Sequence, residues 1–126
     1  MEYRITFYAS AEGEKPVVEF LESLRGTNPV LHRLVTAGLV KLRQRDNHGL
    51  PLTAPIQGSA SLYELRVGRA NIARVFLFFR PNREIVCTNG YVKKTMKLDP
   101  REIARAERYK ADWERRHPQA IRSSST

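Results

Sequence analysis

The 126 residues of the chain are the length of one domain and enough to bury roughly two-thirds of its unfolded surface. The 41% hydrophobic and 28% charged residues are typical of a soluble globular protein, and no apolar run approaches the about 20 residues of a membrane span. The net charge of +9 is uneven. Residues 1–25 hold three basic and five acidic side chains, net −2, and the remainder holds nineteen and eight, net +11. Such a basic gradient favours nucleic acid as the partner, and an acidic protein second.

The compartment is predicted from the N-terminal segment and from the single cysteine. The segment MEYRITFY lacks the basic region followed by an apolar region that defines a signal peptide. Cys87 lies in an apolar run and has no second cysteine to pair with, so we expect a small buried hydrophobe in a reducing compartment. The chain is therefore predicted to be cytoplasmic, without contact to a membrane.

The chain is predicted to open with a strand and a helix. Residues 2–8 alternate apolar and polar side chains, which is the period of a strand. Pro16 suits the first turn of a helix, because the N–H that proline lacks has no helical partner there. The pair Arg25-Gly26 is expected to end this helix.

A second helix is predicted from the N-cap Asn28, followed by a proline, through Arg45. Apolar residues repeat along it at helical spacing, although Gly38 in its interior costs about 1 kcal/mol relative to alanine. Close packing of Gly38 against the first helix would explain that glycine. Residues 50–58 contain two prolines and are predicted to be an irregular loop.

Three short apolar runs follow, at residues 62–67, 71–79 and 84–89. Gly68 follows the first run and the turn pair Pro81-Asn82 follows the second. Runs separated by such turns predict an antiparallel meander of three strands.

A last helix is predicted from the N-cap Asp99, with Glu102 as a capping-box partner, to about Arg116. The element order is then β-α-α-β-β-β-α, an α+β fold with helices packed on an antiparallel meander sheet. We assign residues 1–117 to one domain and 118–126 to a polar tail.

The meander carries the chemistry, because residues 61–97 hold eight cations and only two anions, Glu64 and Glu84. Arg74 stands in a central strand with two apolar faces, and arginine is almost never buried unpaired. One interpretation is a structural ion pair of Arg74 with Glu64 across the hairpin. The other is that Arg66 and Arg74 share a face and offer two guanidinium groups to a phosphate. In that case, changing either arginine to alanine should remove activity and leave thermal stability nearly intact.

Four further cations are candidates for contacts to RNA. Arg69 and Lys97 belong to the meander segment, and Lys41 and Arg45 lie near the predicted end of the second helix. The favourable interaction of cations with a helix C-terminus explains the last two without any RNA.

RNA can be cleaved without a metal ion, because its own 2′-hydroxyl attacks the adjacent phosphate and gives a cyclic phosphate and a free 5′-hydroxyl. Such a site needs a base, an acid and cations near the phosphate. Lys93 and Lys94 adjoin, with Lys97 nearby, and crowding by like charges lowers the pKa of a lysine. A solvated loop is the alternative explanation of this trio. The histidines are isolated, so neither a metal nor another cofactor is expected.

Several segments resemble the HigB-like branch of the RelE superfamily of bacterial toxins, often described as phage-derived proteins. They are LYELR (62–66), ARVFLFF (73–79), GYVKKTMKLDPREIARAERYKADW (90–113) and the N-terminal KPVVEFLESL (15–24). The resemblance implies a compact microbial-ribonuclease-like fold and cleavage of mRNA on the translating ribosome. It also implies a helix-turn-helix antitoxin, similar to HigA, as the protein partner.

By this resemblance, Arg66 and Arg74 correspond to the cations that hold the scissile phosphate. Lys94 falls near a further cation of the family, with Lys93 beside it. Tyr91 is the nearest substitute for the late catalytic tyrosine of RelE-type toxins, which has no clear counterpart in this chain.

The function that we predict is therefore that of a metal-independent endoribonuclease, the toxin of a type II toxin–antitoxin pair. A non-catalytic RNA-binding or ribosome-binding domain is the alternative, because the same cations would bind phosphates alone. A DNA-binding regulator ranks below both, since no helix shows a helix-turn-helix pattern.

Overall fold

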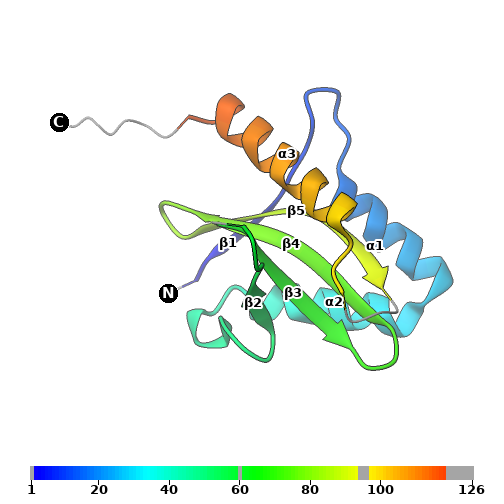
Figure 1. The fold of residues 1–126 in the computed structure, drawn as a ribbon. Coiled ribbons are helices and arrows are strands. Elements are labelled where there is room, and N and C mark those ends of the chain that lie inside the picture. The colour runs from blue at the N-terminus through cyan, green and yellow to red at the C-terminus, as the bar shows by residue number, and fades with distance from the viewer. Residues whose placement is uncertain (1, 60, 94–96, 119–126) are drawn as a thin grey trace.

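The computed structural model describes residues 2–59, 61–93 and 97–118. Five strands form one sheet in the order β1-β5-β4-β3-β2, and three α-helices pack on it (Figure 1). Strand β1 runs parallel to β5, and the other neighbouring strands are antiparallel. In chain order the elements are β1 (Arg4–Phe7), α1 (Pro16–Thr27), α2 (Pro29–Lys41), the 3-10 helix η1 (Arg45–Asn47), β2 (Thr53–Pro55), β3 (Tyr63–Gly68), β4 (Ile72–Arg80), β5 (Glu84–Lys93) and α3 (Pro100–Arg116).

The α+β class and the order of the predicted elements are confirmed, but the sheet is mixed and has a fifth strand. Strand β2 lies within the loop predicted for residues 50–58, and its Thr53 pairs with Leu65 of β3. Pro55 ends this strand at the edge of the sheet, where a missing N–H is tolerated. The parallel pairing of β1 with β5 adds a strand to the meander and makes the sheet mixed.

The second helix ends at Lys41, so the prediction of a continuous helix through Arg45 is wrong. The chain leaves the helix because the backbone of Arg43 pairs with the residue that precedes β1. The Arg43 carbonyl oxygen accepts a hydrogen bond from the Tyr3 N–H at 2.8 Å. A bridge between Glu2 and Gln44 continues this pairing. Arg45 therefore belongs to η1 instead of the last turn of α2.

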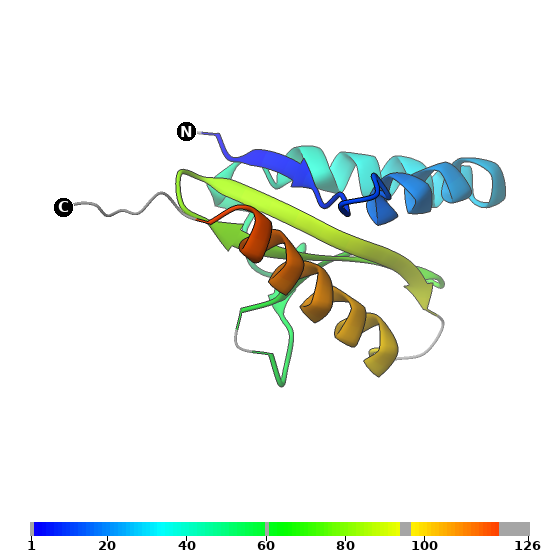
Figure 2. The ribbon, with the colours of Figure 1, turned by 90° about the horizontal axis from the view of Figure 1, so that it is seen from above.

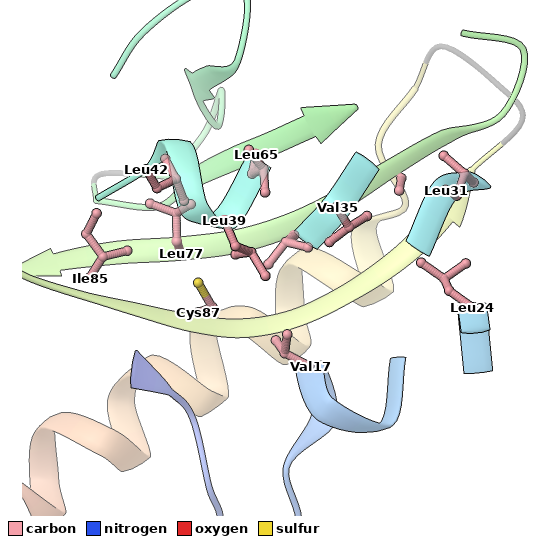
Figure 3. Packing of buried hydrophobic residues seen from close by; sticks show 12 residues of the cluster. Val17, Leu24, Leu31, Val35, Leu39, Leu42, Leu65, Leu77, Ile85 and Cys87 are labelled. Carbon is pink, nitrogen blue, oxygen red and sulfur yellow. The ribbon is translucent and has the colours of Figure 1, made fainter. Parts of the chain in front are cut away.

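The two faces of the sheet are covered by different helices. Figure 2 shows α1 and α2 on one side of the sheet and α3 on the other. The larger core fills the space between α1, α2 and the sheet, and Figure 3 shows its side chains gathered there, with buried Cys87 among them. The second core lies under α3 and includes Phe76, Phe78, Ala106 and Trp113.

Two glycines mark close approaches of helices to the sheet. A Cβ on Gly38 would lie 3.2–3.4 Å from side-chain atoms of Leu65 and Val67, so this glycine packs against β3 and not, as predicted, against α1. A Cβ on Gly90 would lie 2.6 Å from the Phe20 ring, which explains why α1 can pack tightly on β5.

The predicted N-caps are confirmed, but the capping box is not. The Asn28 side chain accepts a hydrogen bond from Leu31 N, and the Asp99 carboxylate accepts one from Arg101 N at 2.9 Å. The Glu102 carboxylate accepts from Asn89 and Arg105 instead of reaching back to Asp99. The third predicted run, 84–89, was too short, because β5 continues to Lys93.

Candidate functional site

Arg66, Arg74 and Tyr91 form a row across three neighbouring strands. Arg66 of β3 lies directly opposite Arg74 of β4, which in turn lies opposite Tyr91 of β5. Residues opposite one another point to the same face of a sheet, with Cβ atoms about 4.5–5.5 Å apart. This is the face that α3 covers, since Tyr91 packs at the edge of the core under α3. The alternation of the strands thus brings the two arginines together, as the sequence predicts.

Arg74 is held by a buried ion pair. Its Nη1 donates to the Glu64 carboxylate, and each of the two side chains is only 7% exposed. The Nε atom of Arg74 has no hydrogen-bond partner in the part of the chain that the structure describes. The predicted ion pair of Arg74 with Glu64 is confirmed. Arg74 also shares a face with Arg66, whose side chain is exposed, and the binding of a phosphate by these two arginines stays a prediction.

Lys93 ends β5 two residues after Tyr91 and therefore points to the same face. The residue is 6% exposed, and its Nζ has no hydrogen-bond partner among residues 2–59, 61–93 and 97–118. Burial lowers the pKa of this amine, and the nearby Arg74 guanidinium lowers it further. The solvated-loop explanation is therefore wrong for Lys93. Lys94 lies outside the described residues, and Lys97 is exposed in the bend before α3.

Tyr91 connects the site to α3. Its hydroxyl oxygen accepts a hydrogen bond from the backbone N–H of Asp99 at 3.1 Å. Burial raises the pKa of the Tyr91 hydroxyl above its ordinary value. The phenol therefore keeps its proton at neutral pH, which suits a proton donor and not a base.

An open hollow of about 740 Å³ lies beside this row, at the edge of β3 beyond its pairing with β2. Arg66 and Arg74 line it, together with Lys41 and Arg69, two of the four cations predicted to bind RNA. The other two do not line it: Arg45 is exposed in η1, and Lys97 lies near α3. The hollow thus combines four cations at one open site.

Asp46, Asn47 and Leu50 also line the hollow and were not among the predicted site residues. Their only sequence signal was the end of the second helix, because an Asn followed closely by Gly49 marks a stop. These residues line the same hollow as the cations because η1 and the loop after it fold back toward β3. Such a contact between distant segments cannot be predicted from the local sequence.

The residues that the structure describes contain neither a cluster of metal ligands nor a helix that could span a membrane. No three or more His, Cys, Asp or Glu side chains gather there in an arrangement that would hold a metal ion. No helix in residues 2–59, 61–93 and 97–118 is both long enough and apolar enough to cross a membrane.

The fold and the site define an α+β protein with a cationic hollow at one edge of its sheet. Residues 22–111 match the family model described as phage derived protein Gp49-like (DUF891). The chain belongs to this family, which is a family of RelE/HigB-like toxins. The match spans every residue of the row and of the hollow. A search of the curated proteins finds no match.

Proposed function

We propose that this protein is the toxin of a type II toxin–antitoxin pair and that it cleaves mRNA on the ribosome without a metal ion. One observation carries the proposal: Arg66, Arg74 and the buried amine of Lys93 converge on one face of the sheet beside an open cationic hollow. Membership of a RelE/HigB-like toxin family supports it. Its protein partner is then a helix-turn-helix antitoxin similar to HigA.

In the proposed reaction the 2′-oxygen of the RNA forms a bond to the adjacent phosphorus as the bond from phosphorus to the 5′-oxygen breaks. A base takes the 2′ proton, and an acid gives a proton to the departing 5′-oxygen. Arg66 and Arg74 would neutralise the charge that builds up on the phosphate oxygens. Glu64 fixes one side of the Arg74 guanidinium, so that Arg74 is oriented before RNA arrives.

Lys93 is our candidate for the base and Tyr91 for the acid. A lysine with a lowered pKa has a larger neutral fraction near pH 7, which is the form that accepts a proton. Tyr91 keeps its proton and lies on the same face two residues away. Because the Lys93 amine is buried, RNA binding has to bring it into contact with the 2′-hydroxyl, and a rotamer change of this long side chain would do so.

A non-catalytic RNA-binding domain is the second candidate. The observation that favours it is the pairing of Arg74 with Glu64, which takes up part of the guanidinium that would otherwise hold a phosphate. In that case Arg66, Arg69 and Lys41 bind phosphates, and the strand stays intact.

The test is a brief pulse of expression, followed by mapping of mRNA ends in cells and in a translation mixture with and without ribosomes. We expect new 5′-hydroxyl and cyclic-phosphate ends only where ribosomes are present. Arg66→Ala should lower the cutting rate by a factor of at least about 10², the order expected for loss of one preorganised donor. Arg33→Ala is the matched control, since Arg33 is exposed on α2 and does not line the hollow. Binding without any new ends would favour the second candidate.

A further inference from the structure

The hollow beside Arg66 contains more than cations. Its walls include the apolar side chains of Leu34, Leu50 and Val67. Leu34 is 41% exposed and Leu50 is 75% exposed, so both leave apolar surface open in the part of the chain that the structure describes. A volume of about 740 Å³ lies within the range of roughly 300–1,000 Å³ that small-molecule sites occupy. The hollow therefore has the size and the apolar surface to receive a flat ring.

The polar groups of the hollow include both signs of charge. Arg66 and Arg74 come from the sheet, whereas Asp46 and Asn47 come from η1. The Asn47 Nδ2 donates to the Lys41 carbonyl oxygen at 2.9 Å, which leaves the Oδ1 atom of this amide as an acceptor. Asp46 thus offers a carboxylate that only accepts hydrogen bonds, and Asn47 offers an amide oxygen and a second N–H, in a hollow that is otherwise cationic.

We infer that this hollow is a nucleotide subsite, in which the base adjoining the phosphate held by Arg66 lies on Leu34 and Leu50 while Asp46 and Asn47 accept hydrogen bonds from its edge. The inference rests on the proposed function for the identity of the phosphate. Single-stranded RNA is read in this way, with unstacked bases lying on side chains and their edges hydrogen-bonded. Because the Asp46 carboxylate only accepts hydrogen bonds, the preferred base presents donors to it. Guanine presents two adjacent donors, N1–H and the 2-amino group, and is the base that we assign.

The experiment uses the full chain with labelled leucine and valine methyl groups and records their NMR signals during titration with GMP, UMP and ribose 5-phosphate. GMP is expected to shift the methyl signals of Leu34, Leu50 and Val67 and to bind more tightly than UMP. Ribose 5-phosphate carries the phosphate without a base and should leave these methyl signals unchanged. Equal effects of GMP and ribose 5-phosphate, or no effect of GMP on these methyl groups, would overturn the inference.

Two variants sharpen the test. Asp46→Ala should weaken GMP binding roughly 5- to 150-fold and leave ribose 5-phosphate unaffected. Leu50→Ala should weaken GMP binding, whereas Val40→Ala should not, although Val40 is likewise an exposed aliphatic residue, 57% exposed on α2 and outside the hollow. If Asp46→Ala binds GMP as the parent does, the base is not read here.

This experiment can fail independently of the proposed function. If the protein cuts mRNA on ribosomes but GMP does not bind in the hollow, the proposed nuclease activity stands and the base subsite is rejected. If GMP binds in the hollow but the protein does not cut mRNA, the subsite stands and the proposed nuclease activity is rejected.

Discussion

Glu64 and Arg74 form an ion pair in which both side chains are 7% exposed, on neighbouring strands in the middle of a candidate RNA site. The two residues are not directly opposite each other: Glu64 faces Phe76, and Arg74 faces Arg66. The carboxylate therefore reaches diagonally across the hairpin and draws the Arg74 guanidinium toward β3. This geometry gives Arg74 a structural task in addition to any contact with phosphate.

We expect Glu64→Ala and Arg74→Ala each to lower the free energy of unfolding by about 3–5 kcal/mol, because either change leaves the partner charge buried and unpaired. The expectation that Arg74→Ala leaves stability nearly intact is therefore revised. The double variant Glu64→Leu/Arg74→Met should lose less than either single variant. Urea unfolding measures all three, with Arg66→Ala as the exposed control, expected within about 0.5 kcal/mol of the parent. A loss below about 1 kcal/mol for Glu64→Ala would contradict this account.

The hairpin that aligns Arg66 with Arg74 depends on Gly68. This residue has φ +111°, and a Cβ on it would lie 2.2 Å from the Asn71 carbonyl oxygen. Gly49 has a similar φ of +105° but nothing within 4 Å of a Cβ. Alanine at either position would suffer similar backbone strain. The difference in stability between the two alanine variants therefore measures the clash of the Cβ with the Asn71 carbonyl oxygen.

Gly68→Ala should therefore lower the free energy of unfolding by about 1–3 kcal/mol more than Gly49→Ala, the usual cost of overpacking. Urea unfolding of both variants measures the difference. Equal losses would mean that the loop after β3 relaxes without disturbing the hairpin.

Local chemistry was enough to predict part of the fold and part of the site. The caps at Asn28 and Asp99 follow from side-chain acceptors next to a proline, and both hold. The row of Arg66 and Arg74 follows from the alternation of two strands joined by a short turn, which needs no information from elsewhere in the chain.

What the sequence did not predict depends on contacts between distant segments. The parallel pairing of β1 with β5 joins residues 80 positions apart, such as Arg4 and Glu84. The partner of Gly38 was misassigned because a helix that packs on both a helix and a sheet shows the same apolar spacing for either. The hollow was missed for the same reason, since its lining comes from α2, η1, β3 and β4 together.

Acid stability is expected to depend on Asp112 in α3. Its carboxylate accepts hydrogen bonds from Arg116 at 2.7 and 3.0 Å and from the Tyr8 hydroxyl at 2.7 Å, and these bonds lower its pKa from 3.8 to about 2. A carboxyl whose pKa is lower in the folded state stabilises that state above its ordinary pKa, and this contribution is lost as the pH falls. The contribution of Asp112 should therefore decline between pH 3.8 and about 2.

Thermal unfolding of the parent and of Asp112→Asn across that range checks the prediction. The parent should be the more stable above pH 4, and the difference should shrink toward pH 2. Glu107→Gln, on the exposed side of the same helix, is the control and should not reproduce this dependence. A difference that stays constant with pH would assign the effect to lost hydrogen bonds alone.

Lys93 provides a prediction that separates chemistry from folding. Its pKa is lowered from 10.5 by burial and by Arg74, so protonation of Lys93 disfavours the folded state. The unfolded chain then binds the proton more tightly, and the free energy of unfolding must rise as the pH climbs from the lowered pKa toward 10.5. Lys93→Met keeps the length of the side chain and removes the charge. At pH 7 this variant should be at least as stable as the parent, and it should lack that rise at high pH.

The same variant should lose about 10²–10³-fold of the mRNA cutting rate if the amine acts in the reaction. The parent and Lys93→Met are therefore compared in two ways. Calorimetry from pH 7 to 10.5 measures their stability, and mapping of mRNA ends on ribosomes measures their cutting rate. A stable Lys93→Met protein that still cuts at the parental rate would remove Lys93 from the reaction. A variant less stable than the parent at pH 7 would instead show that the ammonium group has a stabilising partner in the fold.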